Sequence, residues 1–275
     1  MAEGDLSFCL GLMRLTGWGN TADDLRRMMS YEPGGCFIAS LDGEDVGMVG
    51  SISYGRVGWV GDLIVLPDHR GRRIGASLVR RALRHLEGSG VVSVRLDSVE
   101  KAIPLYRRLG FREEYPSLRF TGIGRSSRAS GVERMNQADL AEVSELDERY
   151  FGAPRERVLG RVLHDFPDLC HVARVGSRIS GYIMAKVGEG SHKIGPWICD
   201  PREPGLAEAL LRRIMDEADG ESLWVGVPGG NLASVEILKS NGFGSLPTST
   251  RMCLGDCAPM GDVRGVFGIG AADKG

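Results

Sequence analysis

One short stretch of the chain, "DHRGRRIGASL" at residues 68–78, gathers positive charge and glycine in a place where an anion could bind. It follows an apolar run typical of a strand and precedes a helical pattern. The first N–H groups of a helix lack intrahelical partners, and the helix dipole adds partial positive charge there. Gly71 and Gly75 leave room for close approach, while Arg70, Arg72 and Arg73 add charge beside the amides. The stretch is therefore expected to cradle a phosphate.

Two common phosphate-binding motifs do not fit this stretch. A P-loop requires G-x-x-x-x-G-K-[ST], and no lysine follows Gly75. A dinucleotide fingerprint requires G-x-G-x-x-G, which is also missing here. The phosphate must therefore belong to another class of ligand.

The elements that position the stretch are expected to alternate between strands and helices. Residues 36–55 form two strand-like runs around "DG", and residues 57–66 form an apolar run suited to a central strand. From Ile74 onward the apolar residues recur with helical spacing. A capped helix is expected at 20–29, a short helix at 100–110, and strands at 91–96 and 118–123. The fold class predicted is α/β with a mixed central sheet flanked by helices.

The chain also repeats itself. A shift of 134 residues pairs Gly61 with Gly195 and Ile64 with Ile198, and a shift of 132 then pairs Arg119 with Arg251. Matched element order at a nearly constant offset indicates a tandem duplication. The predicted domains are residues 1–126 and 131–275, with the core of the second copy ending near 255. They are joined by the small-residue stretch "GIGRSSRASG", which is typical of a linker.

The segment "RGRRIG", Arg70 to Gly75, resembles the R-x-x-G-x-G/A pyrophosphate loop of the GNAT superfamily of N-acetyltransferases. The preceding strand "DLIVLP" resembles the fourth strand of that superfamily. "PLYRRLGF", Pro104 to Phe111, resembles its later motif, with a tyrosine four residues before Gly-Phe. Arg73 stands where the superfamily usually has the first glycine, and an arginine fits there if the backbone stays helical.

The resemblance implies acetyl-CoA as the ligand and one set of residues that contact the coenzyme A. The pyrophosphate would lie on the amides of residues 72–77, and the pantetheine would pair with the strand before the loop. The expected binding residues are Ile64, Val65, Leu66, Arg70, Gly71, Arg72, Arg73, Ile74, Gly75, Ala76 and Ser77. A backbone N–H near Val65 would stabilise the carbonyl oxygen.

Tyr106 and Asp62 are the expected catalytic residues. In the family motif Tyr106 is the general acid, since a phenol can protonate or hydrogen-bond a leaving thiolate without ionising at neutral pH. Asp62 could orient the acceptor ammonium or take its proton, although strand alternation could also turn it to the other face. Asp97 and Glu100 are similar candidates, and water could serve instead of a base, so the role of general base stays open.

The second copy lacks the features that define the first site. Its loop is two residues shorter, so Arg70 and Gly71 have no counterparts, and Leu238 stands where the first copy has Tyr106. The second copy therefore resembles a degenerate GNAT domain without its cofactor. Its expected role is structural or as one wall of an acceptor pocket.

Composition narrows the alternatives. The chain has 275 residues, 42% hydrophobic and 25% charged, with a formal net charge of −2, which argues against nucleic-acid or membrane-surface binding. The six cysteines are dispersed and expected to be reduced and buried, and no metal-ligand set is apparent. No targeting or membrane-spanning pattern is recognised, so a cytoplasmic monomer or homodimer is expected.

The leading hypothesis is an acetyl-CoA-dependent N-acetyltransferase acting on a small-molecule primary amine. A non-catalytic coenzyme A-binding or metabolite-sensing module and a protein-lysine acetyltransferase are the alternatives. A closed pocket beside the thioester would favour the first alternative, and an open peptide groove would favour the second.

Overall fold

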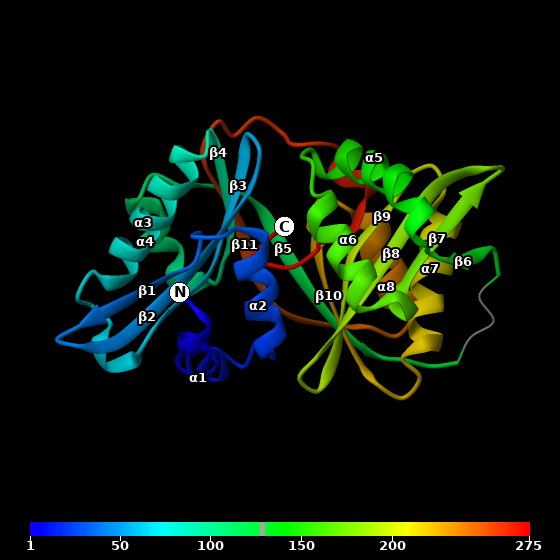
Figure 1. Cartoon of the computed structure of the whole chain (residues 1–275). Coiled ribbons are helices and arrows are strands. Elements are labelled where there is room, and N and C mark those ends of the chain that lie inside the picture. The colour runs from blue at the N-terminus through cyan, green and yellow to red at the C-terminus, as the bar shows by residue number, and fades with distance from the viewer. Residues whose placement is uncertain (127–129) are drawn as a thin grey trace. The chain divides into compact units, whose positions relative to one another are not determined.

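The computed structural model describes residues 1–126 and 130–275 (Figure 1). Part of the predicted linker, residues 127–129, lies outside the described residues. The chain divides into two compact units. Unit 1 comprises Met1–Glu114, Thr250–Cys257 and Ala272–Gly275, and unit 2 comprises Tyr115–Ser249 and Ala258–Ala271. Each unit is α/β with a mixed sheet and packed helices, as the sequence predicted.

Unit 1 is built mainly from the first repeat. Its elements are η1 (Glu3–Asp5), α1 (Leu6–Thr16), α2 (Ala22–Tyr31), β1 (Phe37–Leu41), β2 (Glu44–Tyr54), β3 (Val57–Val65), η2 (Pro67–His69), α3 (Ile74–Gly88), β4 (Ser93–Ser98), η3 (Glu100–Ala102) and α4 (Ile103–Arg108). Strand β5 (Arg112–Ile123) begins in unit 1 and continues into unit 2.

Unit 2 repeats the plan. Its elements are β6 (Val132–Arg134), η4 (Gln137–Asp139), α5 (Leu140–Phe151), α6 (Glu156–Asp165), η5 (Pro167–Leu169), β7 (Cys170–Val175), β8 (Arg178–Gly188), β9 (Ser191–Cys199), α7 (Pro204–Glu217), β10 (Ser222–Pro228), α8 (Leu232–Ser240), η6 (Val263–Gly265) and β12 (Val266–Gly268). Strand β11 (Gly244–Gly255) begins in unit 2 and ends in unit 1.

Local sequence signals explain a helix start and a turn in unit 1. Thr21 caps α2 by accepting a hydrogen bond from the Asp24 N–H, and the Asp24 carboxylate accepts from Thr21 N–H in return. Asp42 and Gly43 have φ values of 53° and 88°, as the two-residue turn between β1 and β2 requires. Helix α1 was not predicted from the sequence.

The last strand of each repeat completes the sheet of the other unit. Residues 250–255 of β11 pair antiparallel with β4, with Arg251 opposite Asp97. Residues 117–123 of β5 pair antiparallel with β10. The two units therefore differ in membership from the repeat boundaries at 1–126 and 131–275, because strand pairing, unlike repeat similarity, is set by partners distant in the chain.

Strand β3 has one open edge and one bulge, and both lie near the predicted site. It pairs parallel with β4 only where Val57 to Trp59 face Ser93 to Arg95, and no further pairing between these strands occurs within the described residues. On its other side it pairs with β2, where Met48 faces Ile64 and Gly50 faces Gly61. Two residues of β3, Asp62 and Leu63, therefore oppose one residue of β2, which defines a β-bulge.

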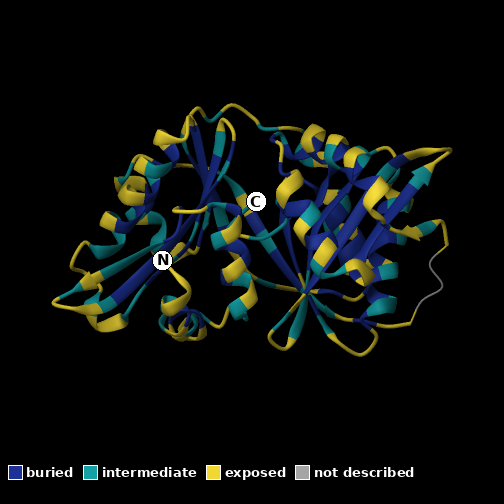
Figure 2. Ribbon diagram, viewed as in Figure 1, coloured by how far each residue is buried: buried dark blue, intermediate teal, exposed yellow. Residues whose placement is uncertain are grey.

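The cores lie between the sheets and their helices, with the strands mostly buried and the outer helix faces exposed (Figure 2). In unit 1, Leu78, Val79, Ala82 and Leu86 form the buried face of α3. They pack with β2, β3 and β4 residues in one cluster, and α1 forms a second cluster with Met48 and Ile64. Both faces of the unit 1 sheet are thereby covered by helices.

The expectation of reduced cysteines is wrong for one pair. Cys253 and Cys257 form a disulfide, and their Cα atoms are 5.8 Å apart because the chain turns directly after β11. Cys9, Cys36, Cys170 and Cys199 are free and buried, as predicted. Within residues 1–126 and 130–275, every helix is too short or too polar to cross a membrane.

Candidate functional site

The loop before α3 presents open backbone amides to solvent. Gly71 has a φ of 78°, a left-handed conformation that glycine adopts at low cost. Residues 70–73 are exposed, and among the described residues no side chain caps the N-terminus of α3. The amides of the first helical turn, from Ile74 to Ala76, therefore have no intrahelical partner, which is the arrangement that favours an anion.

Arg73 differs from the sequence-based expectation. Its backbone is not right-handed helical but left-handed, with φ 63° and ψ 7°. This is the conformation in which glycine is favoured, which explains the glycine of the R-x-x-G-x-G/A pattern at this position. A residue other than glycine destabilises the fold by roughly 1–2 kcal/mol in this conformation, so Arg73 lowers stability relative to a glycine.

Arg70 ties the loop to strand β3. Its Nε donates a 3.0 Å hydrogen bond to the carbonyl oxygen of Val65. The N–H of Leu66 donates to the Val46 carbonyl on the β2 side, at 2.9 Å. Since successive residues of a strand point their peptide groups in opposite directions, the N–H and C=O of Val65 face the open edge. Arg70 is thus a brace for the loop as well as a charge beside it.

Helix α4 lies next to the start of α3. A Cβ atom placed on Gly75 would lie 3.6 Å from the Cδ2 of Leu105 and 3.8 Å from the Cγ2 of Val65. Gly75 thus stands where α3, α4 and β3 converge. Ala76 and Ser77 follow in the same turn of α3, while Ile64 is buried in the α1 cluster and pairs with Met48.

Tyr106 is in the hydrophobic cluster of unit 1. Its side chain is buried among α3 and β4 residues and contacts the Phe111 ring edge to face, with centroids 5.7 Å apart. Burial raises the pKa of Tyr106 above the usual value near 10. The phenol therefore stays protonated throughout the neutral range.

Asp62 occupies the bulge in β3 with a φ of 51°. This conformation is uncommon for residues other than glycine, although aspartate and asparagine tolerate it better than most. The bulge interrupts strict alternation, so the side-chain direction could not be read from period-2 counting. Asp62 is 7% exposed, and a Cβ atom on Gly50 would lie 3.8 Å from its Oδ2.

The other candidate bases have different environments. The Asp97 side chain is fully buried in an ion pair with Arg251, whose Nε lies 2.7 Å from Asp97 Oδ1. The Arg251 guanidinium also stacks over the Trp59 ring at 4.5 Å. Glu100 is exposed in η3. Asp97 thus has a structural partner in Arg251, whereas Glu100 lies at the surface.

Sequence reasoning missed two residues beside Asp62. The backbone of Asp273 lies against Gly61, and Lys274 is held to Asp273 by an ion pair. No local motif marks this segment, whose neighbours are small residues and glycines. Only the three-dimensional contact reveals it.

The equivalent place in unit 2 is closed. Strand β12 pairs with β9 at Trp197 and Ile198, which correspond in the repeat to Leu63 and Ile64 of β3. The N–H of Ile269 then donates to the Gly226 carbonyl of β10. The chain's own strand therefore fills the gap between β9 and β10, which pair directly only from His192 to Ile194.

The loop before α7 is also unsuited to an anion. Pro204 removes one N–H from the first turn, and the Asp200 carboxylate accepts hydrogen bonds from the backbone and guanidinium of Arg202. These bonds lower the pKa of Asp200 to about 2, so a negative charge persists there. Leu238 is buried at the position that corresponds to Tyr106.

Both units match known family models. The model described as "Acetyltransferase (GNAT) family" matches residues 12–111, and the one described as "Acetyltransferase (GNAT) domain" matches residues 143–268. The chain therefore belongs to the GNAT acetyltransferase family and carries two such domains in tandem.

Particular relatives cover different shares of the chain. A mycothiol acetyltransferase from Streptomyces coelicolor is 37% identical over 94 residues, 32% of this chain and 30% of that protein. A glucosamine 6-phosphate N-acetyltransferase from Trypanosoma brucei brucei is 36% identical over 63 residues, 23% of this chain and 43% of that protein. The alignments thus span less than half the length of these two relatives.

Solved structures resemble the chain over almost its whole length. A putative acetyltransferase from Pyrococcus horikoshii has a TM-score of 0.86 and 25% identity, covering 100% of this chain and 94% of that one. A tandem GNAT protein from the clavulanic acid biosynthesis pathway has a TM-score of 0.62 and 14% identity, covering 94% and 98%. The predicted tandem GNAT fold is confirmed.

Proposed function

We propose that the chain is an N-acetyltransferase that transfers the acetyl group of acetyl-CoA to the primary amine of a small molecule. One observation carries the proposal: unit 1 combines an uncapped, arginine-rich helix start with an adjacent open strand edge. The names of the mycothiol and glucosamine 6-phosphate relatives support a small-molecule acceptor.

The residues of unit 1 fit acetyl-CoA. The exposed amides after Arg73 and the guanidinium groups of Arg70 and Arg72 suit a pyrophosphate. The outward peptide group of Val65 and the edge beyond Trp59 suit an extended amide chain such as pantetheine, paired as a strand would be. In unit 2, β12 and the Asp200–Arg202 pair fill the corresponding positions, so we assign one coenzyme site per chain.

Bound acetyl-CoA would supply a thioester carbonyl to the acceptor amine. The Val65 N–H would donate to the carbonyl oxygen as negative charge develops there. The Asp62 carboxylate would orient the acceptor ammonium and accept its proton, directly or through water.

Tyr106 would donate a proton or a hydrogen bond to the leaving sulfur. Because burial raises the pKa of Tyr106, full transfer of its proton to a thiolate with a conjugate-acid pKa of about 8.5 is uphill by about 1.4 kcal/mol per pKa unit. A short hydrogen bond from the phenol to the sulfur needs no complete transfer. We therefore assign Tyr106 first as a hydrogen-bond donor to the thiolate.

The first test is thermal unfolding with and without acetyl-CoA or CoA. A ligand that binds only the folded state stabilises by RT ln(1 + [L]/Kd), so saturating cofactor should raise the melting temperature. Arg70→Ala combined with Arg72→Ala should abolish most of that shift, because the loop loses positive charge and the hydrogen bond from Arg70 to Val65.

The matched control is Arg80→Ala combined with Arg84→Ala. Both arginines are exposed further along α3, so this control removes the same charge away from the loop. We expect it to keep the full shift. If cofactor gave no shift with the native protein, the assignment would fail at its first step.

A further inference from the structure

The C-terminal residues Ala272–Gly275 belong to unit 1, where they lie against β3. A Cβ atom on Gly61 would lie 2.8 Å from the carbonyl oxygen of Asp273, so the segment fits only because Gly61 has no side chain. The Tyr54 hydroxyl donates a 2.7 Å hydrogen bond to the carbonyl oxygen of Lys274. The segment is therefore fixed on β2 and β3 next to the bulge.

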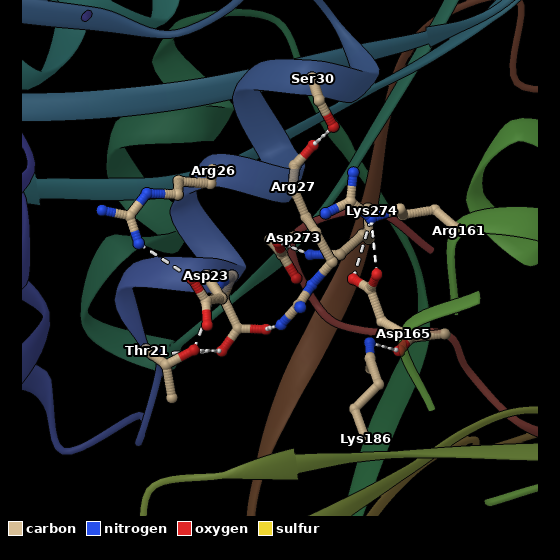
Figure 3. Close-up of polar contacts among 12 residues, drawn as sticks. Thr21, Asp23, Arg26, Arg27, Ser30, Arg161, Asp165, Lys186, Asp273 and Lys274 are labelled. Carbon is tan, nitrogen blue, oxygen red and sulfur yellow. Dashed lines mark hydrogen bonds and ion pairs between the residues drawn. The ribbon is translucent and has the colours of Figure 1, made fainter. Parts of the chain in front are cut away.

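The Lys274 ammonium is in a strongly acidic environment. Its side chain is 11% exposed and forms an ion pair with Asp273, the residue before it (Figure 3). Burial on its own would lower the pKa of Lys274, but Asp273, Asp62 and Asp24 outweigh burial and raise that pKa above its ordinary value. Lys274 thus remains a cation at neutral pH.

Two observations link this cation to the carboxylate that the proposed function assigns to the acceptor. Asp273, its ion-pair partner, lies against Gly61, the residue before Asp62. Asp62 is also one of the carboxylates that raise the pKa of Lys274. An incoming primary amine arrives as an ammonium and needs the same negative field around Asp62. A second ammonium would repel the first, so both cannot be held there together.

We propose that Lys274 occupies the acceptor-amine position of unit 1, and that the acceptor is a primary ammonium on an unbranched alkyl chain that displaces it. The inference rests on the proposed function and names its substrate class. The Lys274 side chain is itself an alkyl ammonium, so it shows which shape and charge the place accepts. Protonated and paired with Asp273, Lys274 has no lone pair for attack and is a mimic of the acceptor without being acetylated.

The test truncates the Lys274 side chain and supplies the removed part as a free amine. Lys274→Ala removes the part of the side chain that n-propylammonium reproduces, so n-propylamine is the probe. Release of the CoA thiol from acetyl-CoA is measured with increasing n-propylamine. We expect kcat/KM for n-propylamine to rise by about tenfold over the native protein, equivalent to about 1.4 kcal/mol.

Lys239→Ala is the matched control, since Lys239 is exposed on α8 and the charge change is the same. It should behave as the native protein does. If Lys274→Ala keeps its melting shift with acetyl-CoA but turns over n-propylamine no faster, the inference is overturned while the proposed function stands. If acetyl-CoA shifts neither protein, the proposed function fails and the inference falls with it.

Two measurements on the native protein need no variant. Peptide mass spectrometry after incubation with acetyl-CoA should find Lys274 unmodified. An acetyl group on Lys274 would make it a substrate and would overturn the inference that it mimics the acceptor. Hydrogen exchange should increase in residues 272–275, but not in β12, on adding n-propylammonium at a concentration that supports turnover. Unchanged exchange in residues 272–275 would also overturn the inference.

Discussion

Two residues near the proposed site have backbone conformations that the surrounding sequence does not predict. Arg73 and Asp62 both have left-handed backbones, one at the start of α3 and the other in the β3 bulge. Residues in such sparsely populated regions cluster at functional sites, where surrounding structure holds them. Both lie in the region that we assign to the cofactor and the acceptor.

His171 makes a pH dependence testable at the residue scale. Its side chain is fully buried in unit 2, and burial, assisted by Arg213, lowers the pKa of His171 from 6.5 to about 4. Between those values the unfolded chain binds a proton that the folded chain does not. The free energy of unfolding should therefore fall as pH decreases through this window, by up to about 1.4 kcal/mol per pH unit.

The dependence is measured by urea unfolding at several pH values between 4 and 7. His171→Leu should flatten the fall in stability, whereas His164→Leu, at an exposed position of α6, should leave it unchanged. Equal slopes for the native protein and His171→Leu would contradict the assignment to His171.

At the scale of elements, the end of β11 holds a buried charge pair in unit 1. Arg251 donates to Asp97 of β4 and covers the Trp59 ring of β3, close to where β3 and β4 separate. Removing one partner of a buried pair leaves an uncompensated charge. The pair therefore contributes to holding β11 on β4.

Arg251→Met should destabilise the protein by about 3–5 kcal/mol, measured by urea unfolding. The double variant Arg251→Met, Asp97→Leu should recover a large part of that loss, because neither charge is then left alone. If the single and double variants were equally unstable, the packing of Arg251 on Trp59 would matter more than the ion pair.

Sequence patterns predicted the elements with local signals and missed those without them. The capped helix α2, the turn at Asp42 and Gly43, and the loop before α3 all depend on residues within a few positions of one another. The strand with which the last strand of each repeat pairs lies far away in the chain, so no local signal predicts it. Strands β5 and β11 carry equivalent arginines, Arg119 and Arg251, so the repeat pattern suits either sheet and cannot choose between them.

At the scale of the whole molecule, neither repeat contains a complete unit. Unit 1 needs residues 250–257, and unit 2 needs most of β5. A fragment of residues 1–126 would leave the β4 edge open and Asp97 without its ion-pair partner Arg251.

We expect the fragment 1–126 to lack a cooperative thermal transition when produced alone. Coexpression with residues 127–275 should restore a folded complex, because the missing strand is then supplied from the second polypeptide. Circular dichroism and size-exclusion chromatography would check both statements. A fragment 1–126 that melted cooperatively on its own would show that the strand from the second repeat is dispensable.

Strand β12 makes the filling of the gap in unit 2 independent of metabolite concentration, unlike the proposed site in unit 1. Because β12 is tethered to the sheet that it completes, its local concentration is set by chain length and does not vary in the cell. By the assignment above, the matching gap in unit 1 is filled only in proportion to the available acetyl-CoA. On that assignment the gap in unit 2 is always filled, whereas the stability of unit 1 would follow acetyl-CoA abundance.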